Sequence, residues 1–250
     1  MDMIWVWVAD MTTENTLKST THDVVLTSKQ VTYLTELYLI IRNAGIMDDE
    51  LVATSLLSDA LYDTRSNTSR MIERLQKRGM LHHVPYQGIR LTEEGEKHAL
   101  IRLRKRRIIN TFLVTVMGFD WHEIYDETRR IESSTDDTVL QRMFVLAGQP
   151  THDPFGEHIP EEGEIPQDDD TLLTNAPVKA TYRLARVTIR ATDRLQYLDA
   201  LGMRPETEFD LLSRAPFDGP LQIKIGREYR ILGHNLATVI WVSAITPTDN

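Results

Sequence analysis

A run of small polar and cationic side chains between residues 63 and 79 is the segment best suited to contact a partner. Its apolar residues Met71, Ile72 and Leu75 recur at helical spacing, and Gly79 can end the helix. In the major groove of DNA, arginine pairs bidentately with guanine and asparagine with adenine. A short helix that exposes such side chains near its N-terminal end therefore predicts a reader of double-stranded DNA.

The charge of the chain is unevenly distributed. The formal net charge is −9, which by itself would not suggest a DNA-binding protein. The acidic surplus lies elsewhere, as between Asp153 and Asp170, and local rather than net charge governs contact with phosphates. The positive charges gathered in and after the reader helix are Arg65, Arg70, Arg74, Lys77, Arg78, Arg90, Lys97, Arg102, Arg104, Lys105, Arg106 and Arg107.

The elements before the reader helix are predicted to be helical. Apolar residues at helical spacing predict a helix over 28–43, and a second helix is expected to begin at a cap on Asp49. The reader helix itself is expected to begin at Ser66 or Asn67. Three short helices of this kind are typical of a helix-turn-helix fold.

The elements after the reader helix predict a wing and a helical domain. Residues 80–91 alternate around a Pro- and Gly-containing turn, which is typical of two paired strands. Thr92 is expected to cap a long basic helix that runs to about Val116. Two more helices are predicted over 121–131 and 136–147.

The last part of the chain changes to strand-like alternation. A Pro- and Gly-punctuated loop covers 149–160, and residues 161–177 are predicted to form a flexible acidic linker. A short helix is expected around 193–201. The predicted strands start at Ala180 and continue at 208–212, 221–225, 228–231 and 238–242. This pattern predicts a small all-β module of SH3-like character.

The sequence therefore predicts an α+β multidomain protein with a winged helix-turn-helix, an all-α dimerisation domain and a C-terminal SH3-like small β-barrel. The expected boundaries are an N-terminal tail over 1–25, the winged helix over 26–98, the helical domain over 99–160, the linker over 161–178 and the SH3-like domain over 179–250.

Composition excludes several classes of function. The absence of cysteine rules out disulfides and thiolate metal sites and suits a cytoplasmic protein. No apolar run is long enough to cross a bilayer, so no membrane partner is expected. No zinc-enzyme spacing, phosphate loop or nucleophile elbow is present, so the chain is predicted not to be an enzyme. The apolar start, residues 1–10, either forms an extra strand or precedes a true translation start at Met11.

Three segments together resemble the diphtheria-toxin-repressor/manganese-transport-regulator (DtxR/MntR) family of metal-dependent transcriptional repressors. The first is the winged helix, with Ile72–Gly79 and Leu91–Gly95. The second combines Arg104–Leu113 with Gly118–Glu127, and the third and most specific is the loop Pro150–Pro160. The C-terminal module resembles the SH3-like domain of the same family, which also occurs in ferrous-iron transport accessory proteins.

The resemblance implies a homodimer that presents one recognition helix to each half of a palindromic DNA operator. It implies that Ser66, Asn67, Ser69 and Arg70 face the bases. The side chains expected to hold phosphates are Thr64, Arg65 and Arg90. The simpler alternative is that these residues cap and solvate a surface helix.

The resemblance also implies an iron(II) or manganese sensor, but the positions that supply its ligands are mostly changed. Only Glu132 retains ligand chemistry, and arginine, which stays protonated, repels a cation. The equivalent positions are Thr32, Thr35, Arg106, Asn110, Tyr125, Arg129, Glu132 and Ser133, with Ala191 and Arg194 in the C-terminal domain. The sequence therefore predicts no intact metal site and weakened or lost metal dependence.

A guanidinium group is expected to replace the positive charge of the metal. In this hypothesis Arg106 or Arg129 pairs with Glu132 and ties the helices together. The alternative is that both arginines are simply solvated.

Three other interpretations remain open. Metal control could persist through substitute ligands, namely His122, Asp126, Glu127 and Glu132. A separate metal site could form in the loop from His152, Asp153, Glu157 and His158, although a structural role fits that loop better. In the third interpretation the SH3-like domain is a protein-interaction module, and DNA contact is secondary.

Overall fold

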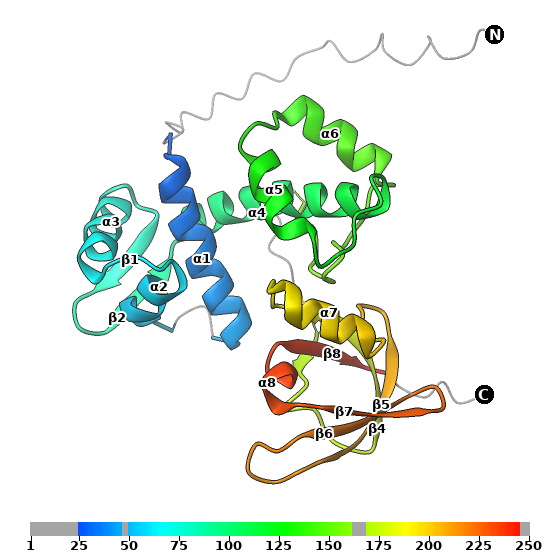
Figure 1. Cartoon of the computed structure of the whole chain (residues 1–250). Coiled ribbons are helices and arrows are strands. Elements are labelled where there is room, and N and C mark those ends of the chain that lie inside the picture. The colour runs from blue at the N-terminus through cyan, green and yellow to red at the C-terminus, as the bar shows by residue number, and fades with distance from the viewer. Residues whose placement is uncertain (1–24, 47–49, 162–168, 246–250) are drawn as a thin grey trace, which may run out of the picture.

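The computed structural model describes residues 25–46, 50–161 and 169–245. Three parts are arranged around one long helix (Figure 1). The N-terminal helices and a small hairpin lie at one end of this helix, two shorter helices pack along its other half, and a β-rich module lies below them in the view. The positions assigned to 1–24, 47–49, 162–168 and 246–250, including Asp49 and the apolar start, lie outside the described residues.

The first part is a winged helix-turn-helix, as predicted. Its elements are α1 (Ser28–Ala44), α2 (Thr54–Ala60), α3 (Arg65–Lys77), β1 (Leu81–Val84) and β2 (Gly88–Leu91). Thr27 caps α1 in a capping box with Gln30, and Gly45 ends it in the left-handed conformation. Helix α3 begins at Arg65, before the expected start at Ser66 or Asn67, because Thr64 is its N-cap.

The second helix differs from its expected position. It begins at Thr54, because the backbone of Val52 pairs with Ile89 in an antiparallel bridge and so extends the wing instead of the helix. Both hydrogen bonds of this bridge are present, at 2.8 and 2.9 Å. Gly88 permits the close approach, because a Cβ there would lie 2.5 Å from the carbonyl oxygen of Val52.

The helical part follows without a break. Helix α4 (Glu93–Thr115) is capped by Thr92, as expected, and packs against α1, α5 (Ile124–Glu132) and α6 (Asp137–Leu146). Asp136 caps α6 through the backbone N–H of Val139. Helix α4 therefore belongs to both parts and connects the winged helix to the rest of the molecule.

The C-terminal module is an antiparallel sheet of six strands, in the order β3-β8-β4-β5-β6-β7. Its elements are β3 (Thr171–Leu172), β4 (Ala180–Val187), α7 (Thr192–Ala200), β5 (Glu208–Arg214), β6 (Leu221–Ile225), β7 (Glu228–Leu232), α8 (His234–Ala237) and β8 (Ile240–Ala244). Most lie close to their predicted positions, but residues 234–237 form a short helix, and the last strand starts at Ile240 rather than Thr238.

The prediction of a flexible linker over 161–178 is wrong for its second half. Strand β3 pairs with β8, and Leu173 and Ala176 are fully buried. The acidic residues and prolines of this stretch suggested a linker, although Leu173 and Ala176 are apolar. Burial of these two side chains stabilises one conformation of the segment.

Two separate hydrophobic cores hold the molecule. One lies within the winged helix and includes Leu34, Leu37 and Ile72. The other is continuous from the end of α4 and α5, through Phe155 in the 150–160 loop, into the β-module. The helical part and the β-module are thus joined by a shared apolar core.

Candidate functional site

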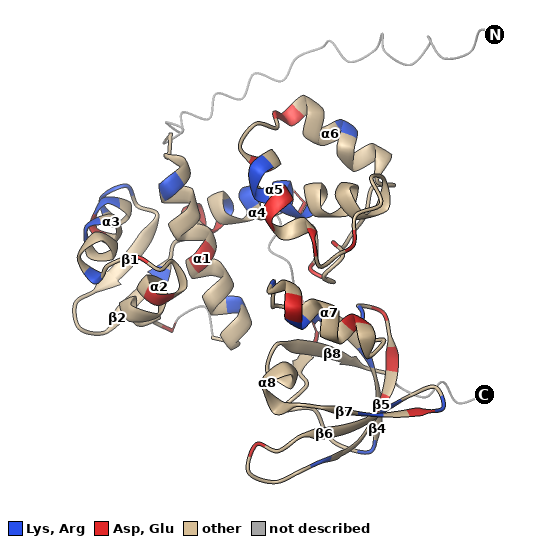
Figure 2. Ribbon diagram, viewed as in Figure 1, with Lys and Arg blue, Asp and Glu red and all other residues tan. Residues whose placement is uncertain are grey.

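The exposed start of α3 carries the residues predicted to read DNA. Ser66, Asn67, Ser69 and Arg70 are all exposed, whereas Thr68 between them is buried. Arg70 donates a hydrogen bond to the Ser66 hydroxyl at 3.2 Å, so its guanidinium lies along the exposed side of the helix. Figure 2 shows several Lys and Arg positions, in blue, along α3.

Asp63, just before α3, orients one of these residues. Its carboxylate accepts a hydrogen bond from the Asn67 side-chain amide at 2.9 Å and another from the Thr64 N–H at 2.8 Å. An amide nitrogen carries two N–H groups, so Asn67 keeps one of them, together with its oxygen, for another partner. The sequence interpretation did not single out Asp63, although aspartate four residues before asparagine is a spacing that brings side chains together on a helix.

Asp63 is also tied to α1. The Tyr33 hydroxyl donates to its carboxylate at 2.6 Å, and the Lys29 ammonium lies 3.2 Å away. The hydrogen bonds from Tyr33, Asn67 and Lys29 hold the pKa of Asp63 well below its usual range. The orientation of Asn67 is therefore linked to the helix that packs on α4.

The remaining predicted DNA contacts lie at the start of α3 and on the wing. Thr64 accepts the backbone N–H of Asn67 at 3.2 Å, and Arg65 is exposed in the first turn of α3. Arg90 is half-buried on β2, opposite His82 of β1. Tyr86, at the tip of the wing, is fully exposed with a φ of 65°.

A guanidinium–carboxylate cluster joins the winged helix to the helical part. Glu132, at the end of α5, is buried and accepts from Arg102 at 3.1 Å and from Arg106 at 3.4 Å. Arg102 also donates to the Ser28 carbonyl at 3.1 Å and to the Thr32 hydroxyl at 2.8 Å. We call these five residues the α1–α4–α5 clasp.

Of the two pairings offered by the sequence hypothesis, the structure contains the one with Arg106. Arg106 does pair with Glu132, but Arg129 does not; its guanidinium lies 5.8 Å from the centre of the Tyr125 ring. Arg102 supplies the second guanidinium, which the sequence interpretation missed. The available signal was its spacing, because Arg102 and Arg106 are four residues apart and share one side of α4.

The other positions expected at a metal sensor do not form a ligand set. The Thr35 hydroxyl donates to the carbonyl of Val31, and the Ser133 hydroxyl donates to the carbonyl of Arg130. Both hydroxyls are therefore engaged by backbone carbonyls three or four residues earlier in the chain. Asn110 donates to Asp153 and accepts from Thr128, at 2.9 and 2.7 Å.

The C-terminal positions do not complete such a set either. Ala191 has no ligand atom, and Arg194 is an exposed cation. Within the described part of the chain, no group of three His, Asp or Glu side chains could hold a metal ion. The chemistry of these positions therefore does not fit a divalent transition metal.

The acids of the 150–160 loop face inward and are paired. Glu157 is buried and lies 2.6 Å from Arg107, 3.6 Å from Arg190 and 3.9 Å from Arg186. Burial raises the pKa of this carboxyl, but the three arginines outweigh burial and lower it overall. His152 and His158 contact each other edge to face instead of joining the acids around an ion.

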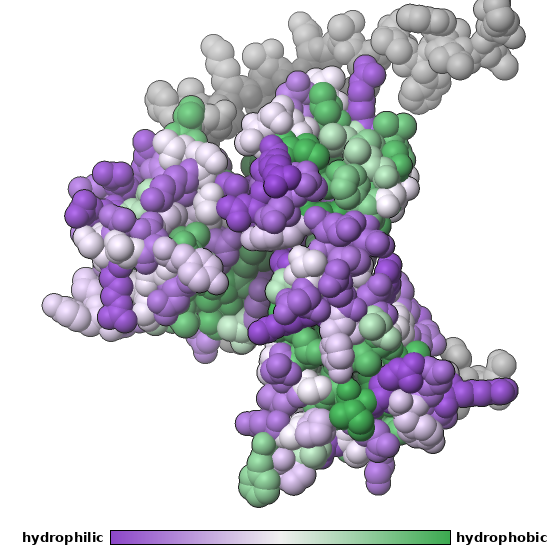
Figure 3. All heavy atoms as spheres, in the orientation of Figure 1, coloured by the Kyte–Doolittle hydropathy of each residue, from purple (hydrophilic) through white to green (hydrophobic). Residues whose placement is uncertain are grey.

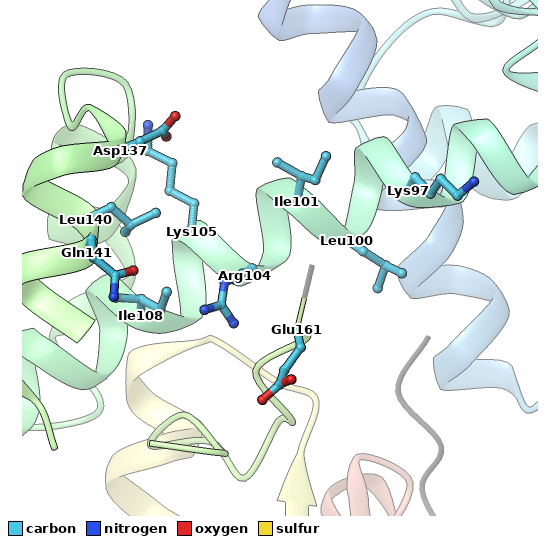
Figure 4. A pocket seen from close by; sticks show the side chains of 10 residues that line it. All are labelled: Lys97, Leu100, Ile101, Arg104, Lys105, Ile108, Asp137, Leu140, Gln141 and Glu161. Carbon is cyan, nitrogen blue, oxygen red and sulfur yellow. The ribbon is translucent and has the colours of Figure 1, made fainter. Parts of the chain in front are cut away.

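A pocket of about 520 Å³ lies between α4 and α6 (Figure 4). Leu100, Ile108 and Leu140 give it apolar walls, and Lys105 and Arg104 project into it from α4. The neighbouring helix α6 has no buried residue, yet it exposes a row of apolar side chains. These are Val139, Val145 and Leu146, whose exposed fractions are 43%, 51% and 66%. Figure 3 shows this apolar surface around α6.

The helical part and the β-module each match a known protein family. Residues 92–161 match the family described as iron dependent repressor, metal binding and dimerisation domain, and residues 171–244 match the FeoA domain. The chain belongs to the DtxR/MntR family. An HTH-type transcriptional regulator of Methanocaldococcus jannaschii is 31% identical over 114 residues, which cover 46% of this chain and 88% of that protein.

Other members of the DtxR/MntR family match over most of their length. The iron-dependent repressor IdeR of Mycobacterium tuberculosis is 26% identical over 226 residues, covering 84% of this chain and 97% of IdeR. A manganese-dependent transcriptional repressor in complex with manganese superposes with a TM-score of 0.77 at 27% identity, covering 86% of this chain and 100% of that one. ScaR with bound Cd2+ gives 0.75 at 25% identity, with coverage of 86% and 99%.

Proposed function

We propose that this protein is a dimeric DNA-binding transcriptional regulator, most simply a repressor, that recognises a palindromic operator. The observation that carries the proposal is the exposed start of α3, where Ser66, Asn67, Ser69 and Arg70 form one row beside the wing. Arg70 and Asn67 read bases, while Thr64, Arg65 and Arg90 contact phosphates. Relatives named as repressors support the same reading.

Selection of binding sites from random DNA duplexes tests this function. The wild-type protein is expected to select one palindromic sequence, with affinity that falls steeply as salt increases. Arg70→Ala should weaken binding by about 1–3 kcal/mol and relax one base position in each half-site. Arg130→Ala is the matched control, because Arg130 is an exposed arginine on α5, far from the reader in sequence and fold. Failure of the wild-type protein to select any sequence would contradict the proposal.

Dimerisation is proposed to use the exposed apolar side of α6. A helix with no buried residue but several exposed aliphatic side chains is expected to pack against a partner. Leu146→Asp should therefore shift the protein to a monomer in analytical ultracentrifugation, whereas Val178→Asp on the β-module should leave the dimer intact. An unchanged dimer in Leu146→Asp would place the interface elsewhere.

The clasp is proposed to do without metal what a bound cation would do, which is to tie α1 and α5 to α4. Two guanidinium groups on one buried carboxylate provide the positive charge, and Arg102 extends the tie to the start of α1. Metal dependence is accordingly weakened or lost, because arginine is permanently charged and competes with a cation for Glu132.

A chelator separates this proposal from its alternative. Operator affinity is expected to stay the same with and without a strong chelator, in protein shown by elemental analysis to lack transition metal. A complex that the chelator disrupts and manganese or iron(II) restores would contradict metal independence. That result would favour a metal-responsive regulator with substitute ligands from His122, Asp126, Glu127 and Glu132.

A further inference from the structure

Three aromatic side chains among the described residues project into solvent from a strained backbone. Tyr62, Tyr86 and Phe217 are 99%, 108% and 99% exposed, and their φ angles are 51°, 65° and 58°. A positive φ is unfavourable for residues other than glycine, and a ring that stays exposed gains no burial in return. Phe217 lies between β5 and β6, and Tyr86 lies at the tip of the wing. Tyr62 lies in the turn that leads into α3.

Tyr62 occupies a position at which helices commonly carry glycine. Its N–H donates to the carbonyl of Asp59 at 3.2 Å, and the N–H of Asp63 donates to the carbonyl of Ser58 at 3.0 Å. These two hydrogen bonds form a Schellman motif that ends α2 after Leu61, its C-cap, with the next residue left-handed. Glycine would make the same hydrogen bonds without the steric cost of a Cβ. The fold therefore uses the left-handed backbone of this turn, but not the tyrosine side chain.

The same turn brings Tyr62 next to the residues proposed to contact DNA. Thr64, the N-cap of α3, and Arg65, its first residue, follow directly after Asp63. The negative charge of Asp63 is offset by the Lys29 ammonium at 3.2 Å, which lowers its repulsion of a phosphate. When a recognition helix lies in the major groove, the helix before it crosses the DNA backbone, so the turn between the two helices lies near that backbone.

We propose that Tyr62 contacts the DNA backbone in the operator complex, where its hydroxyl donates a hydrogen bond to a phosphate oxygen beside α3. Tyrosine is among the side chains that bind phosphates, and its ring can also pack against sugar. The exposure of Tyr62 in the free protein is then accounted for, because the side chain becomes buried only when DNA is bound. This inference deepens the proposed DNA-binding function and rests on it.

Removal of the hydroxyl alone tests the contact. Tyr62→Phe and the wild type are compared by fluorescence anisotropy with the selected operator and with an unrelated duplex, each over a series of salt concentrations. Both affinities should fall by about the same factor, on the order of tenfold, because a phosphate contact carries no sequence information. The slope of log affinity against log salt should stay the same, because the hydroxyl carries no charge that displaces counterions. Arg65→Gln should instead reduce that slope by about 1.

The left-handed backbone provides a second test, in which stability and DNA affinity change independently. Tyr62→Gly removes the steric cost of the Cβ and a side chain that is 99% exposed. Its Tm should therefore stay the same or rise, while affinity for both duplexes falls at least tenfold. Phe217→Gly is the matched control, because Phe217 is equally exposed, has a φ of 58° and lies on the β-module. This variant should show a similar Tm response and no change in DNA affinity.

The remaining outcomes overturn the inference. Unchanged affinity in Tyr62→Phe would exclude the phosphate contact and leave the exposed ring for a protein partner. Loss of affinity in Tyr62→Gly together with a lower Tm would show that Tyr62 acts by stabilising the turn. A wild-type protein that binds neither duplex would contradict the proposed function itself, whereas normal binding by Tyr62→Phe contradicts only this contact.

Discussion

The two junctions of this molecule are built from different interactions. The helical part meets the β-module through one apolar core, in which Trp121, Phe155 and Leu184 are each no more than 2% exposed. The winged helix has its own core and meets α5 through the charged clasp of Arg102, Arg106 and Glu132. Apolar burial is non-directional and involves no charge, whereas ion pairs are screened by salt and respond to competing charges. The first junction therefore suits a fixed scaffold, and the second suits an adjustable one.

The largest loss of stability is expected when the Phe155 side chain is removed from the apolar junction. Phe155→Ala removes a ring that is 1% exposed and packs 5.9 Å from the centre of the Trp121 ring. The free energy of unfolding should fall by about 3–5 kcal/mol, as measured by urea denaturation. Phe217→Ala, at a side chain that is 99% exposed, should change it by less than about 0.5 kcal/mol. Equal effects would show that the apolar junction is not tightly packed.

A smaller effect is expected from a single added methyl group in the same loop. A Cβ on Gly156 would lie 1.9 Å from the carbonyl oxygen of Ala185, and φ there is +80°. Gly156→Ala should therefore combine overpacking with backbone strain and lower the free energy of unfolding by about 2–4 kcal/mol.

Gly202→Ala is the control for the backbone strain alone. Gly202 has a similar φ of +74° but open space around the added Cβ. Its substitution should cost only about 1–2 kcal/mol, close to the penalty of the left-handed conformation. If both variants lose the same stability in urea denaturation, the loop and β4 are not in the close contact described here.

The charged junction should behave in the opposite way, with a modest loss of stability and a clear loss of function. Glu132→Gln leaves Arg102 and Arg106 without their carboxylate, but both side chains are about one-fifth exposed and partly screened. The expected loss of stability is about 1–2 kcal/mol, below the range for a fully buried pair. Operator affinity should fall by about tenfold in fluorescence anisotropy if the clasp holds the readers in position.

Glu127→Gln provides the matched control for this variant. Glu127 is on the same helix and pairs with Arg130 at the surface. It should change both the unfolding free energy and operator affinity by less than about 0.5 kcal/mol. Loss of stability in Glu132→Gln without any loss of operator affinity would show that the clasp is structural only.

The two junctions were not equally predictable from the sequence. Helical and strand periodicity located most elements, because apolar spacing reports directly on burial. The shared apolar core was missed, because Leu173 and Ala176 lie in a stretch whose acidic residues and prolines suggested a linker. The local sequence pattern around an apolar residue does not predict which distant part of the chain that residue will contact.

The charged junction was predicted in kind but not in detail. The need for a guanidinium beside Glu132 followed from the replaced ligand positions, and Arg106 fills that role. Arg102 rather than Arg129 is the second partner, because α5 turns Arg129 toward Tyr125 and the outside. Side-chain direction on a helix depends on the packing of that helix, which spacing alone does not give.

The smallest effect on operator binding is expected at the start of α3, where the charged side chain of Asp63 orients Asn67. Asp63→Asn replaces an acceptor-only carboxylate by an amide, so Asn67 is no longer held in one of its two amide orientations. Overall operator affinity should change little, but site selection should show weaker preference at the one base position that Asn67 is proposed to contact. Asp59→Asn, at an exposed aspartate on α2, should leave the preference unchanged.

The same variant has a defined dependence on pH. The pKa of Asp63 is lowered in the folded protein by its hydrogen bonds with Tyr33, Asn67 and Lys29. Its contribution to stability is therefore complete above the unfolded value of about 3.9 and is lost as pH falls below it toward the folded pKa. Urea denaturation at pH 7 and pH 3 should thus show a smaller acid-induced loss of stability in Asp63→Asn than in the wild type. Parallel pH profiles would show that these hydrogen bonds do not hold Asp63, and that Asn67 orients without it.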